Sequence, residues 1–118
     1  MTSSKKTINR DIITSTISGS TDRKFHIKIL SFDNGYIIIV SENSNKLGAI
    51  SISISTSNNS STLKILPSKF DSIFINSIAE RISKTHNVLC LISLYTTSPL
   101  KLEDMKIIMN EILNMLNE

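Results

Sequence analysis

The stretch Val88-Leu89-Cys90-Leu91-Ile92-Ser93-Leu94 is apolar at both odd and even positions. Successive side chains of a strand point to opposite faces of the sheet, so an interior strand of this kind has apolar groups on both faces. A second stretch, Ile37-Ile38-Ile39-Val40, has the same character. We therefore expect both stretches to form interior strands of one sheet.

Helical periodicity appears on each side of the 88–94 strand. Apolar residues of the segment 70–82 fall on one stripe at positions 70, 73, 74, 78 and 82, with Ser68 as the expected N-cap and Asn87 as the end. After the strand, Ser98 is the expected N-cap of a closing helix and Pro99 its first residue. The stripe expected for that helix consists of Leu102, Met105, Ile108, Met109, Ile112, Leu113 and Leu116.

Five short strand signals precede the first helix, within residues 11–17, 25–29, 36–41, 50–55 and 62–66. Asn34-Gly35 predicts a type I′ hairpin between two of them. In the fourth, Ile50, Ile52 and Ile54 alternate with serines, a pattern typical of a sheet covered on one side.

The predicted fold class is α+β, with a largely antiparallel sheet of about six strands and two helices in the order β-β-β-β-β-α-β-α. Residues 1–10 are expected to form a flexible tail, and residues 11–118 a single domain. Hairpin-length links should join the first strands, and both helices should cover one face.

The sequence offers no pattern for catalysis, metal binding or cofactor binding. Its one cysteine, Cys90, is expected to be a buried thiol, and its two histidines, His26 and His86, are isolated. Glycine-rich phosphate loops and nucleophile motifs are absent from the sequence. We expect a non-enzymatic protein with no cofactor. An enzyme would remain possible if a dimer completed the site.

No signal peptide or apolar span is present, which favours a cytoplasmic and possibly also nuclear protein without a membrane partner. The net charge of +3 is unevenly distributed, because nine basic and four acidic residues lie before Asp71, and four basic and six acidic residues lie from Asp71 onward. Such asymmetry could steer a partner, although ordinary solvated faces are the simpler explanation. Nucleic acid is not an expected partner, since basic residues are not interleaved with aromatic ones.

Apolar strand surface exceeds what two helices can hide. Four exposed apolar side chains on the second face would each gain about 1.5–3 kcal/mol on burial, which favours a dimer or a client interface. Alternatively, the sheet could curl and bury both faces itself. The candidate partner-binding residues, with the strand parity left open, are Ile38, Val40, Lys46, Leu47, Gly48, Leu89 and Leu91.

Several local strings together resemble the proteasome assembly chaperone 3 family over about residues 11–116. They are Tyr36-Ile37-Ile38-Ile39-Val40, Asn45-Lys46-Leu47-Gly48, Phe74-Ile75-Asn76-Ser77-Ile78-Ala79 and the 87–94 strand, with the final helix near Pro99. Asn45 departs from the pattern, in which a glycine is expected before the lysine.

The resemblance implies a non-catalytic chaperone that binds proteasome α-subunits and promotes formation of the 20S α-ring. It also implies action as a dimer, either a heterodimer with a second assembly chaperone of similar fold or a homodimer. A profilin- or roadblock-like dimeric scaffold for a GTPase or a trafficking complex is the alternative. That class usually opens with a helix, whereas residues 1–60 show no helical period.

Overall fold

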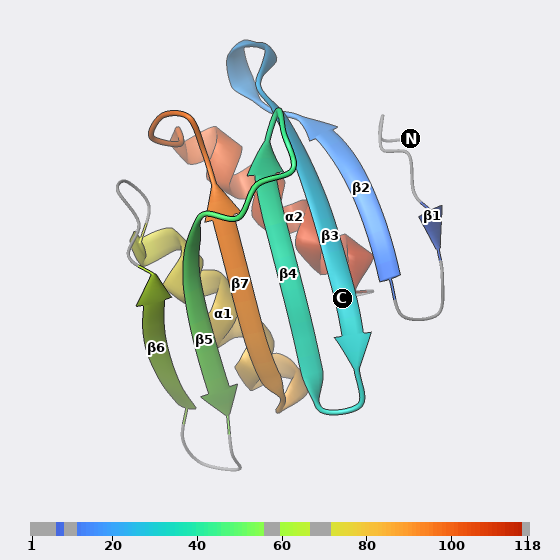
Figure 1. The fold of residues 1–118 in the computed structure, drawn as a ribbon, viewed down its shortest axis with the longest axis vertical. Helices are drawn as coiled ribbons and strands as arrows, with labels where there is room; N and C mark the ends of the chain where they lie inside the picture. The colour runs from blue at the N-terminus through green and yellow to red at the C-terminus, as the bar shows by residue number, and fades with distance from the viewer. Residues whose placement is uncertain (1–6, 9–11, 56–59, 67–71, 117–118) are drawn as a thin grey trace.

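The computed structural model describes residues 7–8, 12–55, 60–66 and 72–116. One sheet and two α-helices account for nearly all of them (Figure 1). In chain order the elements are β1 (Thr7–Ile8), β2 (Ile12–Ser18), the 3-10 turn η1 (Ser20–Asp22), β3 (Lys24–Phe32), β4 (Gly35–Glu42), β5 (Ala49–Ser55), β6 (Ser60–Leu66), α1 (Ser72–His86), β7 (Leu89–Tyr95) and α2 (Leu102–Met115).

The α+β class and the two helices are confirmed, whereas the predicted sheet is only roughly correct. The described strands form a seven-stranded sheet in the order β1-β2-β3-β4-β7-β5-β6. The strand missing from the prediction is β1, which lies within the expected tail and pairs with β2. Most neighbours are antiparallel, but β4 and β7 pair in parallel.

Strand β7 lies between β4 and β5, so these two strands are not the hairpin partners that short sequential links suggested. Its apolar character on both faces suits this interior position. A glycine stands where another element meets each end of β7. A Cβ on Gly35 would lie 2.1 Å from the Leu89 carbonyl oxygen, and one on Gly48 would lie 2.1 Å from that of Leu94. Both positions therefore require glycine.

The β3–β4 hairpin forms, but the predicted turn type is wrong. Phe32 pairs with Gly35, so the two turn residues are Asp33 and Asn34. Neither Asn34 nor Gly35 has a positive φ, and a type I′ turn needs positive φ at both of its central residues. Gly35 is instead the first residue of β4, where the absence of a side chain allows the backbone to approach β7 closely.

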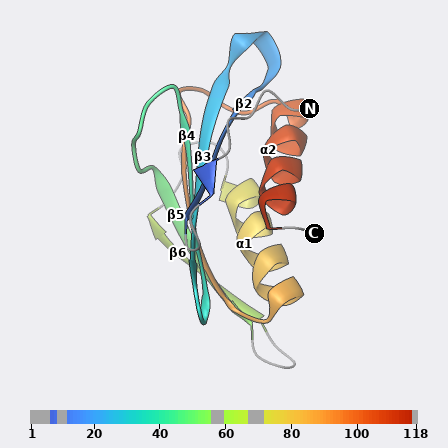
Figure 2. The same cartoon turned by 90° about the vertical axis from the view of Figure 1, so that its right-hand side faces the viewer.

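Both helices lie on the same side of the sheet (Figure 2). Helix α1 packs on β5, β6 and β7, and α2 packs on β2 and β3. Asn87, with φ of 55°, ends α1 as predicted in the left-handed conformation that often follows a helix. Ile73 does not join the buried stripe, because 82% of its surface is exposed, and Ile75 is buried instead. The predicted cap Ser68 lies outside the described residues.

Helix α2 begins three residues later than predicted, with Lys101 rather than Ser98 at its N-cap. Its buried face is centred on Ile108 and Ile112, while Leu102 is exposed. Asp104, in the first turn of the helix, is fully buried. The stripe prediction considered only apolar residues, and it therefore missed the carboxylates on the side that packs against the sheet.

Candidate protein-binding face

The side of the sheet opposite the helices is the candidate functional site, and we call it the uncovered face. Strand register assigns side chains to it without ambiguity. Leu30 of β3 pairs with Ile37 of β4, Ile37 pairs with Leu91 of β7, and Leu91 pairs with Ile52 of β5. These four side chains form an apolar row across the centre of the sheet, and all four are only partly buried.

The row is widened by apolar residues on both sides. Ile12, Phe32 and Ile54 share its face and are among the most exposed large apolar side chains, at 38%, 54% and 50%. Several of these groups lie close together rather than scattered singly. A contiguous apolar surface of this kind is typical of protein contact sites, which makes this face the candidate site.

The predicted partner-binding residues that belong to strands lie on two opposite faces of the sheet. Leu89 and Leu91 lie on the uncovered face, in partial exposure. The expectation that Ile38 and Val40 contribute to an exposed surface is wrong, since both are 0% exposed beneath the helices. The isoleucines of β4 that lie on the uncovered face are Ile37 and Ile39.

In strand β5 the serines face the helices and the isoleucines face away from them, which is the opposite of the usual arrangement. Its isoleucines 50, 52 and 54 point to the uncovered face, whereas Ser51 and Ser53 point to the helices and are fully buried. The Ser51 hydroxyl donates a 2.5 Å hydrogen bond to Asn76 Oδ1 of α1, so the buried polar group is satisfied. The isoleucines of β5 were missed as surface residues. Alternation indicates that two faces differ, but it does not say which one meets the helices.

The other predicted residues, Lys46, Leu47 and Gly48, belong to the connection between β4 and β5, residues 43–48. This connection projects from the sheet on the side opposite the helices, and passes in front of one end of β7 (Figures 1 and 2). The Gly48 amide donates to Ser93 Oγ at 3.0 Å, and Lys46 Nζ lies 5.3 Å from the centre of the Tyr95 ring. Lys46 and Leu47 are exposed. The connection thus forms a rim at one end of the uncovered face.

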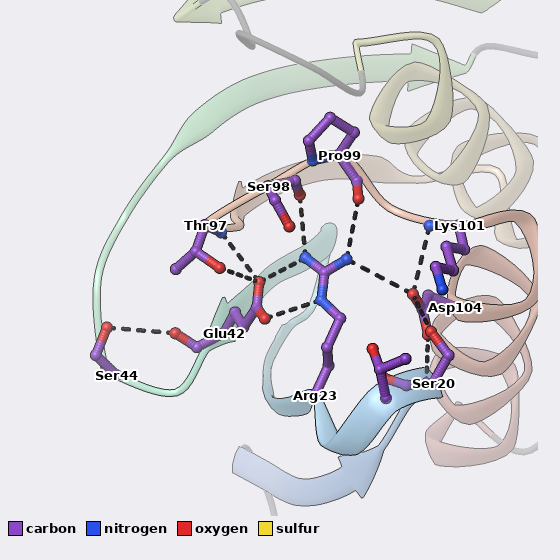
Figure 3. Close-up of polar contacts among 10 residues, drawn as sticks. Ser20, Arg23, Glu42, Ser44, Thr97, Ser98, Pro99, Lys101 and Asp104 are labelled. Atoms are coloured by element: carbon purple, nitrogen blue, oxygen red, sulfur yellow. Dashed lines mark hydrogen bonds and ion pairs between the residues drawn. The ribbon is translucent and has the colours of Figure 1, made fainter.

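A buried ionic network fixes that same end of the sheet, and sequence analysis did not identify it. Arg23 donates to both oxygens of Glu42, from Nη2 at 2.7 Å and from Nε at 2.9 Å (Figure 3). The same guanidinium donates to the Ser98 and Pro99 carbonyl oxygens at 3.0 and 2.9 Å, and its Nη1 lies 3.7 Å from Asp104 Oδ2. It therefore joins η1, the end of β4 and the chain entering α2.

Further hydrogen bonds are donated to both carboxylates of the network. Thr97 donates to Glu42 from its amide and its hydroxyl, and Ser20 donates to Asp104 in the same way. The hydrogen bond from Arg23 holds the pKa of Glu42 below its ordinary value, against the opposing effect of burial. Burial alone would raise the pKa of Asp104, but the bonds from Ser20 and Lys101 and the charge of Arg23 lower it overall. Such a network holds a fold together and offers no proton for catalysis at neutral pH.

The remaining candidates for chemistry are accounted for by packing. Cys90 is fully buried, and burial raises its thiol pKa to about 12. Within residues 7–8, 12–55, 60–66 and 72–116, no three His, Cys, Asp or Glu side chains are grouped as a metal site would require. Neither α1 nor α2 has the length and apolar character to cross a membrane.

The architecture defines a small α+β domain with two helices on one face of a mixed sheet and an apolar second face. No family model and no curated protein matches the sequence. The fold is similar to that of a chain in the crystal structure of a novel chaperone complex for yeast 20S proteasome assembly, with a TM-score of 0.61. The two sequences are 12% identical, and the match covers 89% of this chain and 96% of the yeast chain. At this identity the likeness establishes the fold.

Proposed function

We propose that this protein is a non-catalytic assembly chaperone that binds proteasome α-subunits and promotes formation of the 20S α-ring. The observation that carries the proposal is the near full-length fold similarity to a chain of a proteasome assembly chaperone complex. Fold alone does not define function, but the apolar uncovered face supplies a site suited to protein binding. The proposed location is the cytoplasm, and possibly also the nucleus.

The proposed chaperone acts as a dimer through the uncovered face. The central row of this face is only partly buried, and sheet-on-sheet packing would remove it from water. The partner in this proposal is a second assembly chaperone of similar fold or a second copy of this chain, and the resulting dimer recruits the α-subunits.

Affinity capture of the tagged protein from its own cells tests the proposal. The wild type should recover proteasome α-subunits in complexes that lack β-subunits. Leu91→Asp places a charge in the apolar row and should abolish recovery of the dimer partner. Leu102→Asp is the matched control, because Leu102 is an exposed apolar residue on the helical side and its replacement should leave recovery unchanged.

Three results would contradict the proposal. Recovery of GTPases or trafficking factors in place of α-subunits would favour the dimeric scaffold. Full recovery of the partner by a folded Leu91→Asp variant would exclude the uncovered face as the interface. A monomer at high concentration, with no associated protein in the capture, would refute the proposed dimer.

A further inference from the structure

A hollow of about 110 Å³ lies on the uncovered face next to the 43–48 connection. Its floor is formed by two cross-strand pairs of β2 and β3, Thr14 with Lys28 and Thr16 with His26. Asn45 of the connection lines it from above, and Ile39 lies at its apolar side. The hollow therefore places donor groups beside the apolar row.

The polar groups of the hollow are suited to an anion. Lys28 is partly buried, as expected for a lysine whose aliphatic stem packs along the sheet while its ammonium stays accessible to a ligand. Thr16 Oγ1 and His26 Nδ1 lie 3.1 Å apart in a hydrogen bond, which fixes the imidazole across the pair of strands. A carboxylate accepts hydrogen bonds from ammonium, hydroxyl and imidazole N–H groups alike.

The charge of the surrounding face has one sign. Strand β3 presents Lys24, His26 and Lys28 at alternate positions, and no uncovered-face position of β2, β3, β4, β5 or β7 is an Asp or Glu. Among the described residues, the buried carboxylates belong to the covered side: Glu42 and Asp104 are engaged by Arg23, and Glu111 accepts a hydrogen bond from Ser15. Among the described residues of these five strands, Lys28 therefore shares its face with no carboxylate.

We propose that this hollow receives an acidic side chain of a partner protein whose docking surface is apolar at its centre and acidic at this edge. The inference rests on the proposed function, and it specifies the chemistry of the partner. The apolar row fills the centre of the contact, and the Asp or Glu of the partner lies against Lys28 and His26. Complementary charge at such an edge sets orientation and the association rate.

The same observation argues against a second copy of this chain as the occupant. A copy that docks through its uncovered face brings no carboxylate from these five strands, whatever the rotation between the two sheets. Its lysines would remain desolvated without a counter-charge, which disfavours the complex. Nucleic acid is disfavoured as well, because Ile39 and the apolar row adjoin the hollow.

A peptide titration followed by NMR tests the hollow directly. Acetylated hexaglutamate added to the isotope-labelled protein at low salt should shift the amide signals of Thr14, Thr16 and Lys28, whereas hexaglutamine should not. Lys28→Gln should weaken the response about three- to tenfold, the range for losing one partly exposed charge-assisted hydrogen bond. Lys84→Gln, an exposed lysine of α1, is the control and should leave it unchanged.

Three outcomes of the titration would overturn the inference. The first is an undiminished response of Lys28→Gln, and the second is a set of shifts centred on α1 instead of the hollow. The third is an equal response to a six-nucleotide oligothymidylate, which would assign the hollow to nucleic acid.

Affinity capture separates failure of this inference from failure of the proposed function. If both the Leu91→Asp and the Lys28→Glu variants lose the partner, the proposed interface and the acidic contact are both supported. If Leu91→Asp loses the partner but Lys28→Glu retains it at full level, the proposed interface stands and the acidic contact is refuted. If wild-type protein forms a dimer by itself and Lys28→Glu strengthens that dimer, the occupant is a second copy and the inference is overturned.

Discussion

The two faces of β4 and β7 carry similar side chains but differ in what covers them. On the covered face Ile38 and Ile92 pair across the strands and are fully buried by the helical layer. On the uncovered face the adjacent pair, Ile37 and Leu91, is partly exposed. Apolar content alone therefore does not distinguish a core from an interface. The distinguishing property is whether a side chain points to the sheet face that the helices cover or to the opposite face.

The faces also differ in their polar groups. Buried polar side chains under the helices are satisfied within the chain, as in the 2.5 Å bond from Ser15 Oγ to Glu111 Oε2. The hollow on the uncovered face is lined by Thr16, His26 and Lys28, whose polar groups we propose receive an acidic group of a partner. Folding requires that a core satisfy its own buried polar groups. Binding requires a face whose polar groups remain accessible to another molecule.

Neighbouring substitutions on β4 provide the strongest test of this comparison. Ile38→Asp buries a carboxylate among apolar side chains and should lower the free energy of unfolding by about 4–5 kcal/mol or prevent folding. Ile37→Asp, one residue away on the other face, should lower it by about 1 kcal/mol and should instead impair partner binding. Urea unfolding followed by circular dichroism measures both.

A similar stability loss in the two variants would contradict the assignment of faces. It would mean that the protein covers its second face with its own residues, as a closed sandwich would. Ile37→Val is a suitable control, because it keeps an apolar β-branched side chain and should leave both stability and binding nearly unchanged.

The ionic network predicts how stability responds to acid. Glu42 and Asp104 have pKa values below their ordinary ones in the folded state. Their stabilisation is therefore complete above the pKa values of the unfolded chain, and it is lost as the pH falls through the lower values of the folded protein. Free energies of unfolding measured from pH 7 to pH 3 should fall below about pH 4.5.

The double variant Glu42→Gln, Asp104→Asn removes both titrating groups and should be less stable at neutral pH, with a shallower decline in acid. Glu103→Gln changes the exposed neighbour of Asp104 and should preserve the wild-type decline. If the double variant declined as steeply as the wild type, the acid sensitivity would have another origin.

Local patterns were enough to predict most elements of this fold. The alternation in β3, the helical spacing of α1 and the end of that helix at Asn87 all depend on residues close in sequence. The position of β7 between β4 and β5 depends on pairing between distant segments, which no local pattern encodes. The sequence could therefore predict that β7 is interior but not which strands flank it.

The same limit explains the errors at the candidate site. The apolar surplus was visible in the sequence, but assignment of Ile38 and Val40 to the surface needed the position of the helices. The network of Arg23 was invisible because its three ionic members come from distant parts of the chain: the residue between η1 and β3, the end of β4, and α2. Charged residues at element ends are common on solvated surfaces, so nothing in the sequence marked these ones as buried.

Thiol labelling tests which face is exposed with the smallest expected change in stability. Cys90 is buried on the covered face and its pKa is about 12, so it should not react with a disulfide reagent at pH 8 until the protein unfolds. Leu91→Cys adds a thiol on the uncovered face, which should react in the native state and be protected when the partner binds. Counting reacted thiols with and without urea measures both residues in one protein. Native labelling of Cys90, or a Leu91→Cys thiol that reacts only on unfolding, would reverse the assignment of the faces on which the proposed interface depends.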